Sequence, residues 1–142
     1  MSWLEALNAT LVAKLAPLFC TPAVHWIALL CLCSAYLQGG LTKAFDFRVA
    51  LDEMKQFGLR PPAPLAVAVI AMEIGASVLV LSGFLRWAGA LMLGGFTLCA
   101  TFVANRFWDA PRPKRYAIEN SFFEHVGLVG GFILVAWYDL QA

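Results

Sequence analysis

Charged side chains are scarce in this sequence and almost absent from long stretches of it. Asp, Glu, Lys and Arg make up 13% of the 142 residues, whereas 61% are hydrophobic. A typical soluble domain has about a quarter of its residues charged. The formal net charge of +1 leaves no dense basic face, which excludes nucleic acid as a partner. This composition is typical of a protein embedded in a lipid bilayer.

The sequence also lacks the motifs of a self-contained redox or metal enzyme. Its four cysteines have neither CxxC nor zinc-site spacing, and no nucleotide-binding motif occurs. We interpret the cysteines as small side chains that face lipid or the core. We therefore predict no metal site. One alternative, a site made of Glu73, Glu124 and His125, has suitable ligand types but no supporting spacing.

Four apolar runs are long enough to span a membrane. A bilayer core of about 30 Å takes roughly 20 helical residues, and only a helix satisfies every backbone polar group of such a run internally. We predict an all-α integral membrane protein whose single domain, residues 1–142, is a bundle of four transmembrane helices. The predicted spans are residues 24–41, 65–84, 86–103 and 122–138.

An amphipathic segment, residues 1–22, precedes the first span. Ser2 and Glu5 have the spacing of a capping box, and leucines follow at helical intervals. Such a pattern predicts a helix that lies in the membrane interface; a simple extension of the first span is the alternative. Pro17 and Pro22 are expected to break or kink the path into that span.

The positive charges are distributed unequally between the two sides of the predicted bundle. Two long loops, residues 42–64 and 105–120, hold most of the Lys and Arg residues, whereas the opposite side has Lys14 and Arg86. The positive-inside rule therefore predicts that the long loops face the cytoplasm and both termini face outward. Residues 47–57, within the first of these loops, are apolar enough for a short interfacial helix.

Glu73 is the strongest functional signal because it lies inside the second span, about 12 Å along the helix axis from the start of that span. Placing a carboxyl group there costs a few kcal/mol, so it needs a partner or a function. We expect an uncharged carboxyl group. Proton handling by Glu73 is one interpretation, and a hydrogen bond that only fixes helix packing is the other. Candidate ligand-binding neighbours are Gln38, Thr101, Asn105 and His125.

The order of several short motifs resembles the DoxX family of small bacterial membrane proteins. These motifs are Gly39-Gly40-Leu41-Thr42-Lys43-Ala44-Phe45-Asp46-Phe47, the Phe57-Gly58-Leu59-Arg60-Pro61 turn, Met72-Glu73-Ile74-Gly75, Arg86, Phe107-Trp108, and the glycine-rich run from Phe123. The chain departs from the family at His25, where arginine is frequent, and at Glu124-His125, where Lys-Asn is frequent.

The resemblance implies a four-helix protein of the bacterial inner membrane. Members are often described as oxidoreductases, and one branch resembles a subunit of thiosulfate:quinone oxidoreductases. We therefore expect a redox-associated, quinone-linked membrane subunit that works with a partner protein bound at the cytoplasmic loops. Quinone is the one cofactor that this reading invokes, and a homo-oligomer is compatible with it. The alternative is a non-catalytic membrane adaptor or assembly chaperone. A transporter is disfavoured, because Glu73 is the only deeply placed charge.

Overall fold

The structure is a computed structural model that describes residues 2–142, and within that range every regular element is a helix. Four helices are long and apolar enough to cross a membrane. They are α2 (Pro22–Phe45), α4 (Pro62–Ser82), α5 (Arg86–Ala104) and α6 (Arg112–Leu140). The predicted fold class, an all-α bundle of four transmembrane helices, is confirmed.

Two of the helices extend well beyond the apolar runs in the sequence. Helix α2 continues through Lys43 to Phe45, and α6 begins at Arg112, a full ten-residue stretch before the predicted start at Phe122. Hydropathy marks only the part of a helix that lies in lipid. Lysine and arginine are good helix formers, so a helix continues through them into the polar surroundings.

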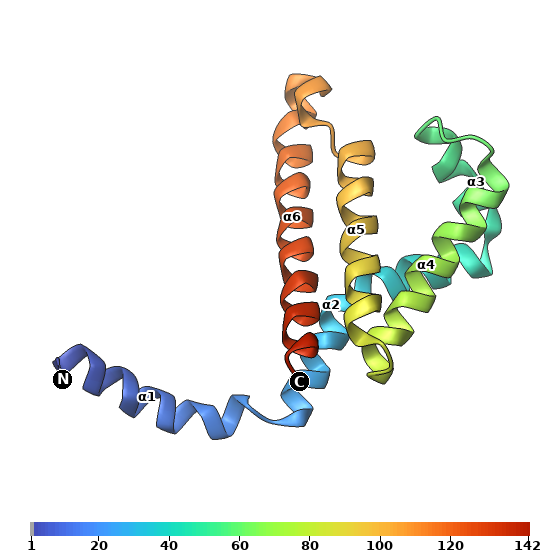
Figure 1. Cartoon of the computed structure of the whole chain (residues 1–142). Helices are drawn as coiled ribbons and strands as arrows, with labels where there is room; N and C mark the ends of the chain where they lie inside the picture. The colour runs from blue at the N-terminus through green and yellow to red at the C-terminus, as the bar shows by residue number, and fades with distance from the viewer. Residues whose placement is uncertain (1) are drawn as a thin grey trace.

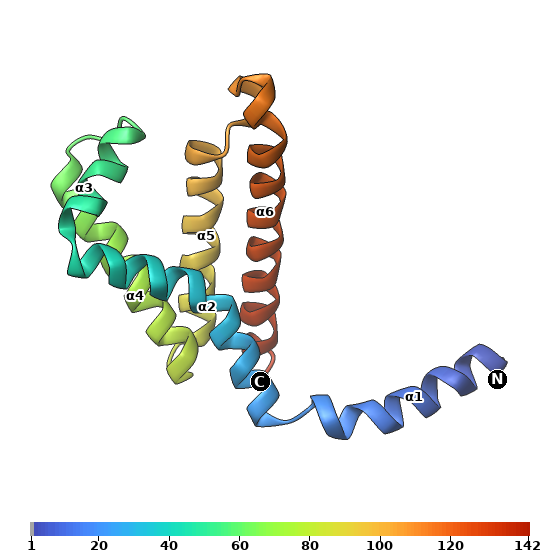
Figure 2. The same ribbon diagram turned by 180° about the vertical axis from the view of Figure 1, so that it is seen from behind.

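The bundle has two unlike ends (Figures 1 and 2). The hairpin end contains the tight Gly83–Leu85 turn, the start of α2 and the end of α6. The loop end contains the short helix α3 (Phe47–Gln56) and the 3-10 turn η1 (Phe107–Asp109). Helix α3 confirms the short helix predicted for residues 47–57. Both long connections lie at the same end, because successive membrane helices alternate in direction.

All four membrane helices meet at the hairpin end. The buried core there draws on each of them, through Leu29, Cys33 and Tyr36 of α2, Ala76 and Val80 of α4, Ala90 and Leu93 of α5, and Phe132 and Ala136 of α6. At Gly89 the backbones of α4 and α5 are so close that a Cβ atom would lie 2.7 Å from the carbonyl oxygen of Ala76. Small residues permit such close packing in membranes.

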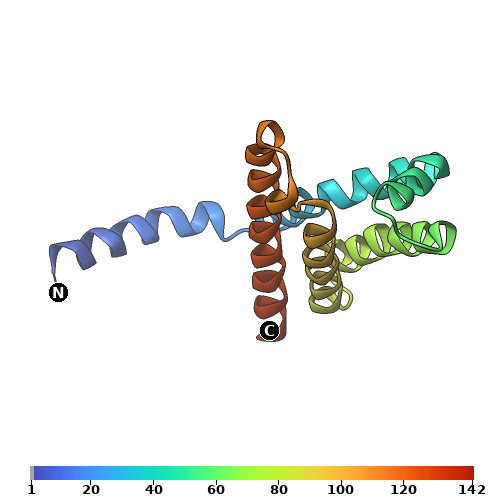
Figure 3. The same ribbon diagram turned by 90° about the horizontal axis from the view of Figure 1, so that it is seen from above.

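Toward the loop end the helices separate into two pairs. Helices α4 and α5 diverge from their hairpin (Figure 1), and α2 runs beside α4 while α5 runs beside α6 (Figure 3). Helix α3 packs against α4 through a second small core of Ala50, Met54 and Ala66. This divergence leaves room between the α2–α3–α4 unit and the α5–α6 pair.

The N-terminal segment forms a separate helix, α1 (Trp3–Phe19), which projects sideways from the hairpin end (Figure 1). Its capping box is present, because Ser2 accepts from the amide of Glu5 and Glu5 accepts from the amide of Ser2. The predicted break in the path into the first span is present, but it lies immediately before Pro22, whereas Pro17 lies inside α1. A proline in the last turn displaces only one backbone bond, and the chain turns instead at Cys20 and Thr21, where α2 begins. Helix α1 is not an extension of α2.

Candidate functional site

Glu73 forms a buried ion pair with Lys43. The ammonium group of Lys43, in the last turn of α2, donates to both carboxylate oxygens of Glu73 at 3.0 and 3.2 Å. The two side chains are only 10% and 8% exposed. The expectation of an uncharged carboxyl group assumed that no cation was near. Lys43 is such a cation, and a buried carboxylate is tolerated when it is paired and hydrogen-bonded. The uncharged form of Glu73 stays a prediction.

A second carboxylate, that of Glu53 on α3, contacts the same ammonium group. Lys43 Nζ lies 2.9 Å from Oε2 of Glu53, whose side chain is 35% exposed. This contact does not have hydrogen-bond geometry, and Oε2 is buried without a hydrogen-bond partner among the described residues. We call Lys43, Glu53 and Glu73 the ionic cluster.

Two glycines of α2 allow the ionic cluster to form. A Cβ atom on Gly40 would lie 2.8 Å from a side-chain carbon of Ile74 and 3.2 Å from Cβ of Glu73, and one on Gly39 would lie 3.6 Å from Oε1 of Glu73. Helix α2 can therefore pass directly over α4 at the level of Glu73. One turn later, the Lys43 side chain reaches back to the carboxylate.

The ionic cluster borders a cavity between the two helix pairs. This polar lobe, of about 220 Å³, is lined by Ala35, Tyr36, Glu53, Phe57, Glu73, Phe96, Thr97, Ala100, Ala104, His125 and Leu128. An apolar lobe of about 280 Å³ adjoins it and is lined by Glu53, Met54, Phe57, Leu59, Val69, Phe96, Cys99, Ala100, Val103 and Ala104. The two lobes share residues of α3 and α5, so together they form one groove with a polar and an apolar part.

Hydroxyl and imidazole groups stand opposite the carboxylates. The hydroxyl of Tyr36 is hydrogen-bonded to that of Thr97, which ties α2 to α5 at the base of the polar lobe. His125 of α6 lines the lobe, and its Nδ1 lies 2.7 Å from the amide nitrogen of Asn105. Because that nitrogen can only donate, Nδ1 is the acceptor in this contact. Carboxylate, phenol and imidazole groups thus meet at one cavity, and all three can exchange protons.

The structure separates the five predicted site residues into three groups. Glu73 and His125 line the polar lobe, and Asn105 holds His125 from behind. The expected contact of Glu73 with Thr101 and Asn105 is not formed. Thr101 is fully buried and its hydroxyl donates to the carbonyl of Thr97 at 2.6 Å, as hydroxyl groups in membrane helices often do.

Gln38 is not brought to the cavity. Its amide donates to the hydroxyl of Thr42 on the exposed side of α2, at 3.2 Å. The alternative metal site is not assembled either, because residues 2–142 contain no group of three acidic, histidine or cysteine side chains placed to hold a metal ion. Glu124, which that site required, is exposed on α6.

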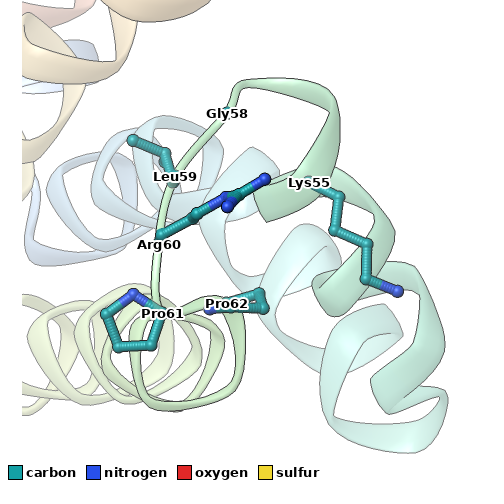
Figure 4. Close-up of a pocket in the computed structure, with 6 residues that line it drawn as sticks. All are labelled: Lys55, Gly58, Leu59, Arg60, Pro61 and Pro62. Atoms are coloured by element: carbon teal, nitrogen blue, oxygen red, sulfur yellow. The ribbon is translucent and has the colours of Figure 1, made fainter.

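A larger cavity lies elsewhere, at the turn between α3 and α4. It measures about 710 Å³ and is lined by Lys55, Gly58, Leu59, Arg60, Pro61 and Pro62. Figure 4 shows its two cationic side chains, Lys55 from α3 and Arg60 from the turn. It has no carboxylate, imidazole or phenol group in its lining, so it offers no group that exchanges protons near neutral pH. We place the functional site at the ionic cluster instead.

Sequence reasoning missed Lys43, Glu53 and Tyr36. Lys43 was counted among the loop charges because the predicted first span ended at Leu41. One signal could have identified it, since a carboxyl group inside a span needs a cation, and Lys43 lies nearest to the end of a neighbouring span. Glu53 gave no signal, because its direction depends on how α3 packs.

Comparison with known proteins agrees with this architecture. The model of the DoxX family matches residues 26–106, more than half of the chain. The chain is 24% identical over 115 residues to the inner membrane protein YphA of Escherichia coli (strain K12), an alignment that covers 81% of this chain and 82% of that relative. No solved structure matches significantly. With its four membrane-spanning helices, the protein is a multi-pass inner-membrane protein and belongs to the DoxX family.

Proposed function

We propose that this protein binds a quinone in the groove between its two helix pairs and serves as the membrane subunit of a redox system. The observation that carries the proposal is the two-part groove. Carboxylate, phenol and imidazole groups converge on its polar lobe, and the adjoining lobe is apolar. A quinone has the matching two parts, a ring that takes up protons on reduction and a hydrocarbon tail.

The ring of the quinone is assigned to the polar lobe. Reduction of a quinone consumes two electrons and two protons, and this chain's residues would supply the protons. Glu73 and His125 face the lobe from opposite walls, and Tyr36 lies at its base. An imidazole can take up a proton and then pass it on, so His125 would act as a relay that returns to its starting state.

The tail is assigned to the apolar lobe. Phe57, Phe96 and Ala100 line both lobes, so a chain bound there continues directly from the ring. Helix packing leaves this lobe between α4 and α5, which are the helices that diverge toward the loop end. Because the tail would come from the bilayer rather than from water, van der Waals packing would hold it there.

The proposal assigns electron delivery to a protein partner at the loop end. That end carries several exposed aromatic side chains, among them Trp108 and Phe123, and the basic residues Arg106 and Arg112. Exposed aromatic and arginine side chains are enriched at protein interfaces. The partner supplies the two electrons, and the orientation with this end in the cytoplasm remains the one predicted from the positive charges.

The test is purification in a mild detergent, followed by extraction and quantification of bound quinone. We expect quinone to co-purify with the wild-type protein and to be lost by at least tenfold in Glu73→Gln and in Ala100→Phe, which fills the passage between the lobes. Glu124→Gln is the matched control, because it removes an exposed carboxylate of α6 outside the groove. Equal quinone content in all four proteins would contradict the proposal.

The adaptor alternative predicts a different effect of these substitutions on the binding of a partner protein. An adaptor would keep its partner after Glu73→Gln and lose it when the residues at η1 are replaced. Crosslinking in intact membranes separates the two functions. A partner that is retained in every groove variant, with no quinone in the wild-type protein, would favour the adaptor.

A further inference from the structure

The ionic cluster contains more negative than positive charge. Lys43 Nζ lies 3.0 Å from Oε1 of Glu73 and 2.9 Å from Oε2 of Glu53, so one ammonium group serves two carboxylates. If all three groups were ionised, the cluster would carry a net charge of −1. A net charge at a site that is largely shielded from water is costly. Binding one further proton would remove it.

No other group that faces the cluster supplies a second positive charge. On α2, Tyr36 is neutral and bonded to Thr97. On α6, Nδ1 of His125 faces the amide nitrogen of Asn105, which can only donate, so this ring nitrogen acts as an acceptor. Helix α5 contributes Phe96, Thr97, Ala100 and Ala104 to the cavity, and none of them is ionisable near neutral pH. The described lining thus leaves Lys43 as the one cation.

We infer that the ionic cluster holds one exchangeable proton, shared by Glu53 and Glu73 across Lys43, and that Glu53 is where this proton enters from the loop end. In the transfer, Lys43 passes a proton from its ammonium group to the Glu73 carboxylate and takes the proton of the Glu53 carboxyl group. Glu53 ends ionised, Glu73 ends protonated and Lys43 is unchanged. One proton has moved and no other bond has been altered.

Glu53 fits the entry position by its exposure and its free oxygen. Its side chain is 35% exposed, against 8% for Glu73, so water reaches Glu53 far more readily. Its Oε2 is buried and faces Nζ of Lys43 at 2.9 Å, so the other carboxylate oxygen is the one that this contact leaves free to carry a proton. Met54 and Ala50 anchor α3 on α4 and hold Glu53 in this direction.

This inference deepens the proposed function, since the shared proton is one that the groove would deliver, but its test needs no quinone. We would record infrared difference spectra of the quinone-free protein after a step in pH and follow the carbonyl stretch of a protonated carboxylic acid. The wild-type protein should show one such band at neutral pH. Glu53→Gln and Glu73→Gln should each abolish it, because each leaves one carboxylate matched to one ammonium group.

The control is Asp52→Asn, which changes the neighbouring residue of α3, whose side chain is 76% exposed and outside the cluster. This variant should keep the band. A band that persists in Glu53→Gln, or a wild-type protein without any band, would overturn the inference.

The amide bands of the same spectra report whether each variant is folded. A second variant, Glu53→Asp, shortens the side chain and should slow the appearance of the carboxylic acid band rather than abolish it. An unchanged rate would exclude Glu53 as the point of entry.

Whether quinone co-purifies with the protein is independent of whether the carboxylic acid band appears. Loss of quinone binding with an intact band would refute the proposed function and leave the shared proton in place. Bound quinone without the band would leave the function standing and refute the relay.

Discussion

The hairpin end and the loop end of this bundle join the same four helices by opposite means. At the hairpin end, contact is between backbones and apolar side chains: Gly89 brings α5 against Ala76, and Phe132 is fully buried. At the loop end, the contact across α2, α3 and α4 is ionic, and a cavity remains. Tight packing fixes the position of the helices. The candidate site lies where that packing ends, since the proposed ligand and shared proton both require unfilled polar space.

The largest effect is expected at the loop end, from Lys43→Met. This change leaves two carboxylates without their cation, and loss of one partner of a buried ion pair costs about 3–5 kcal/mol. The free energy of unfolding in detergent should fall by that amount and recover in part when Glu73→Gln is added. Lys14→Met, at an exposed lysine of α1, is the control. If both lysine variants behaved alike, the ionic cluster would contribute nothing to stability.

The hairpin end is tested by Gly89→Ala against Gly95→Ala. A Cβ atom on Gly89 would overlap with α4, at 2.7 Å from the Ala76 carbonyl and 2.8 Å from Cβ of Leu79, whereas nothing lies within 4 Å of one on Gly95. Overpacking costs about 1–3 kcal/mol, so Gly89→Ala should lower the unfolding free energy by about 2 kcal/mol. Gly95→Ala should be neutral or slightly stabilising. Equal stability of the two variants would show that the helices are not in backbone contact.

A smaller effect is expected from Asp139→Ala, which removes a polar link at the hairpin end. Oδ2 of Asp139 accepts from the amide of Trp87 at 3.0 Å, and Oδ1 lies 3.7 Å from Arg86. The link ties the end of α6 to the start of α5. Its loss should lower the unfolding free energy by about 1 kcal/mol, a typical value for a single hydrogen bond, and should leave the carboxylic acid band of the ionic cluster unchanged. A change in that band would mean that the two ends are coupled.

The smallest effect is expected from Asp52→Asn. Asp52 and Lys55 lie 3.7 Å apart on α3, with side chains 76% and 62% exposed. Exposed ion pairs of this kind contribute about 0–1 kcal/mol. The unfolding free energy should therefore change by less than about 0.5 kcal/mol, measured by the same denaturation in detergent. A larger loss would show that α3 depends on its surface charges rather than on Ala50 and Met54.

The number and type of membrane helices could be predicted because lipid imposes them on any long apolar run. Glu73 could be identified for the same reason, since a carboxyl group stands out in an apolar segment. The limits of the helices could not be predicted as well. Hydropathy ended the first span at Leu41, and the additional turn of α2 is what carries Lys43 into the site.

The contacts of Glu73 depend on the tertiary structure. Lys43 and Glu53 come from other helices, and their approach depends on the crossing at Gly39 and Gly40 and on the packing of α3. Thr101 has the right spacing along α5, yet its hydroxyl donates to its own helix. The sequence alone does not say whether a hydroxyl group bonds within its helix or across to another.

The depth of Glu73 has an electrical consequence. At 1.5 Å per residue, Glu73 lies about 16 Å from the start of α4 at Pro62, close to the middle of a helix that is about 31 Å long. A proton that travels from the surface to this depth crosses a large fraction of the membrane voltage. Moving a unit charge across 100 mV takes about 2.3 kcal/mol, so half of that distance corresponds to about 1 kcal/mol. Because Glu53 and Glu73 contact the same ammonium group, the occupancy of the proposed shared proton should respond to an imposed voltage at both carboxylates.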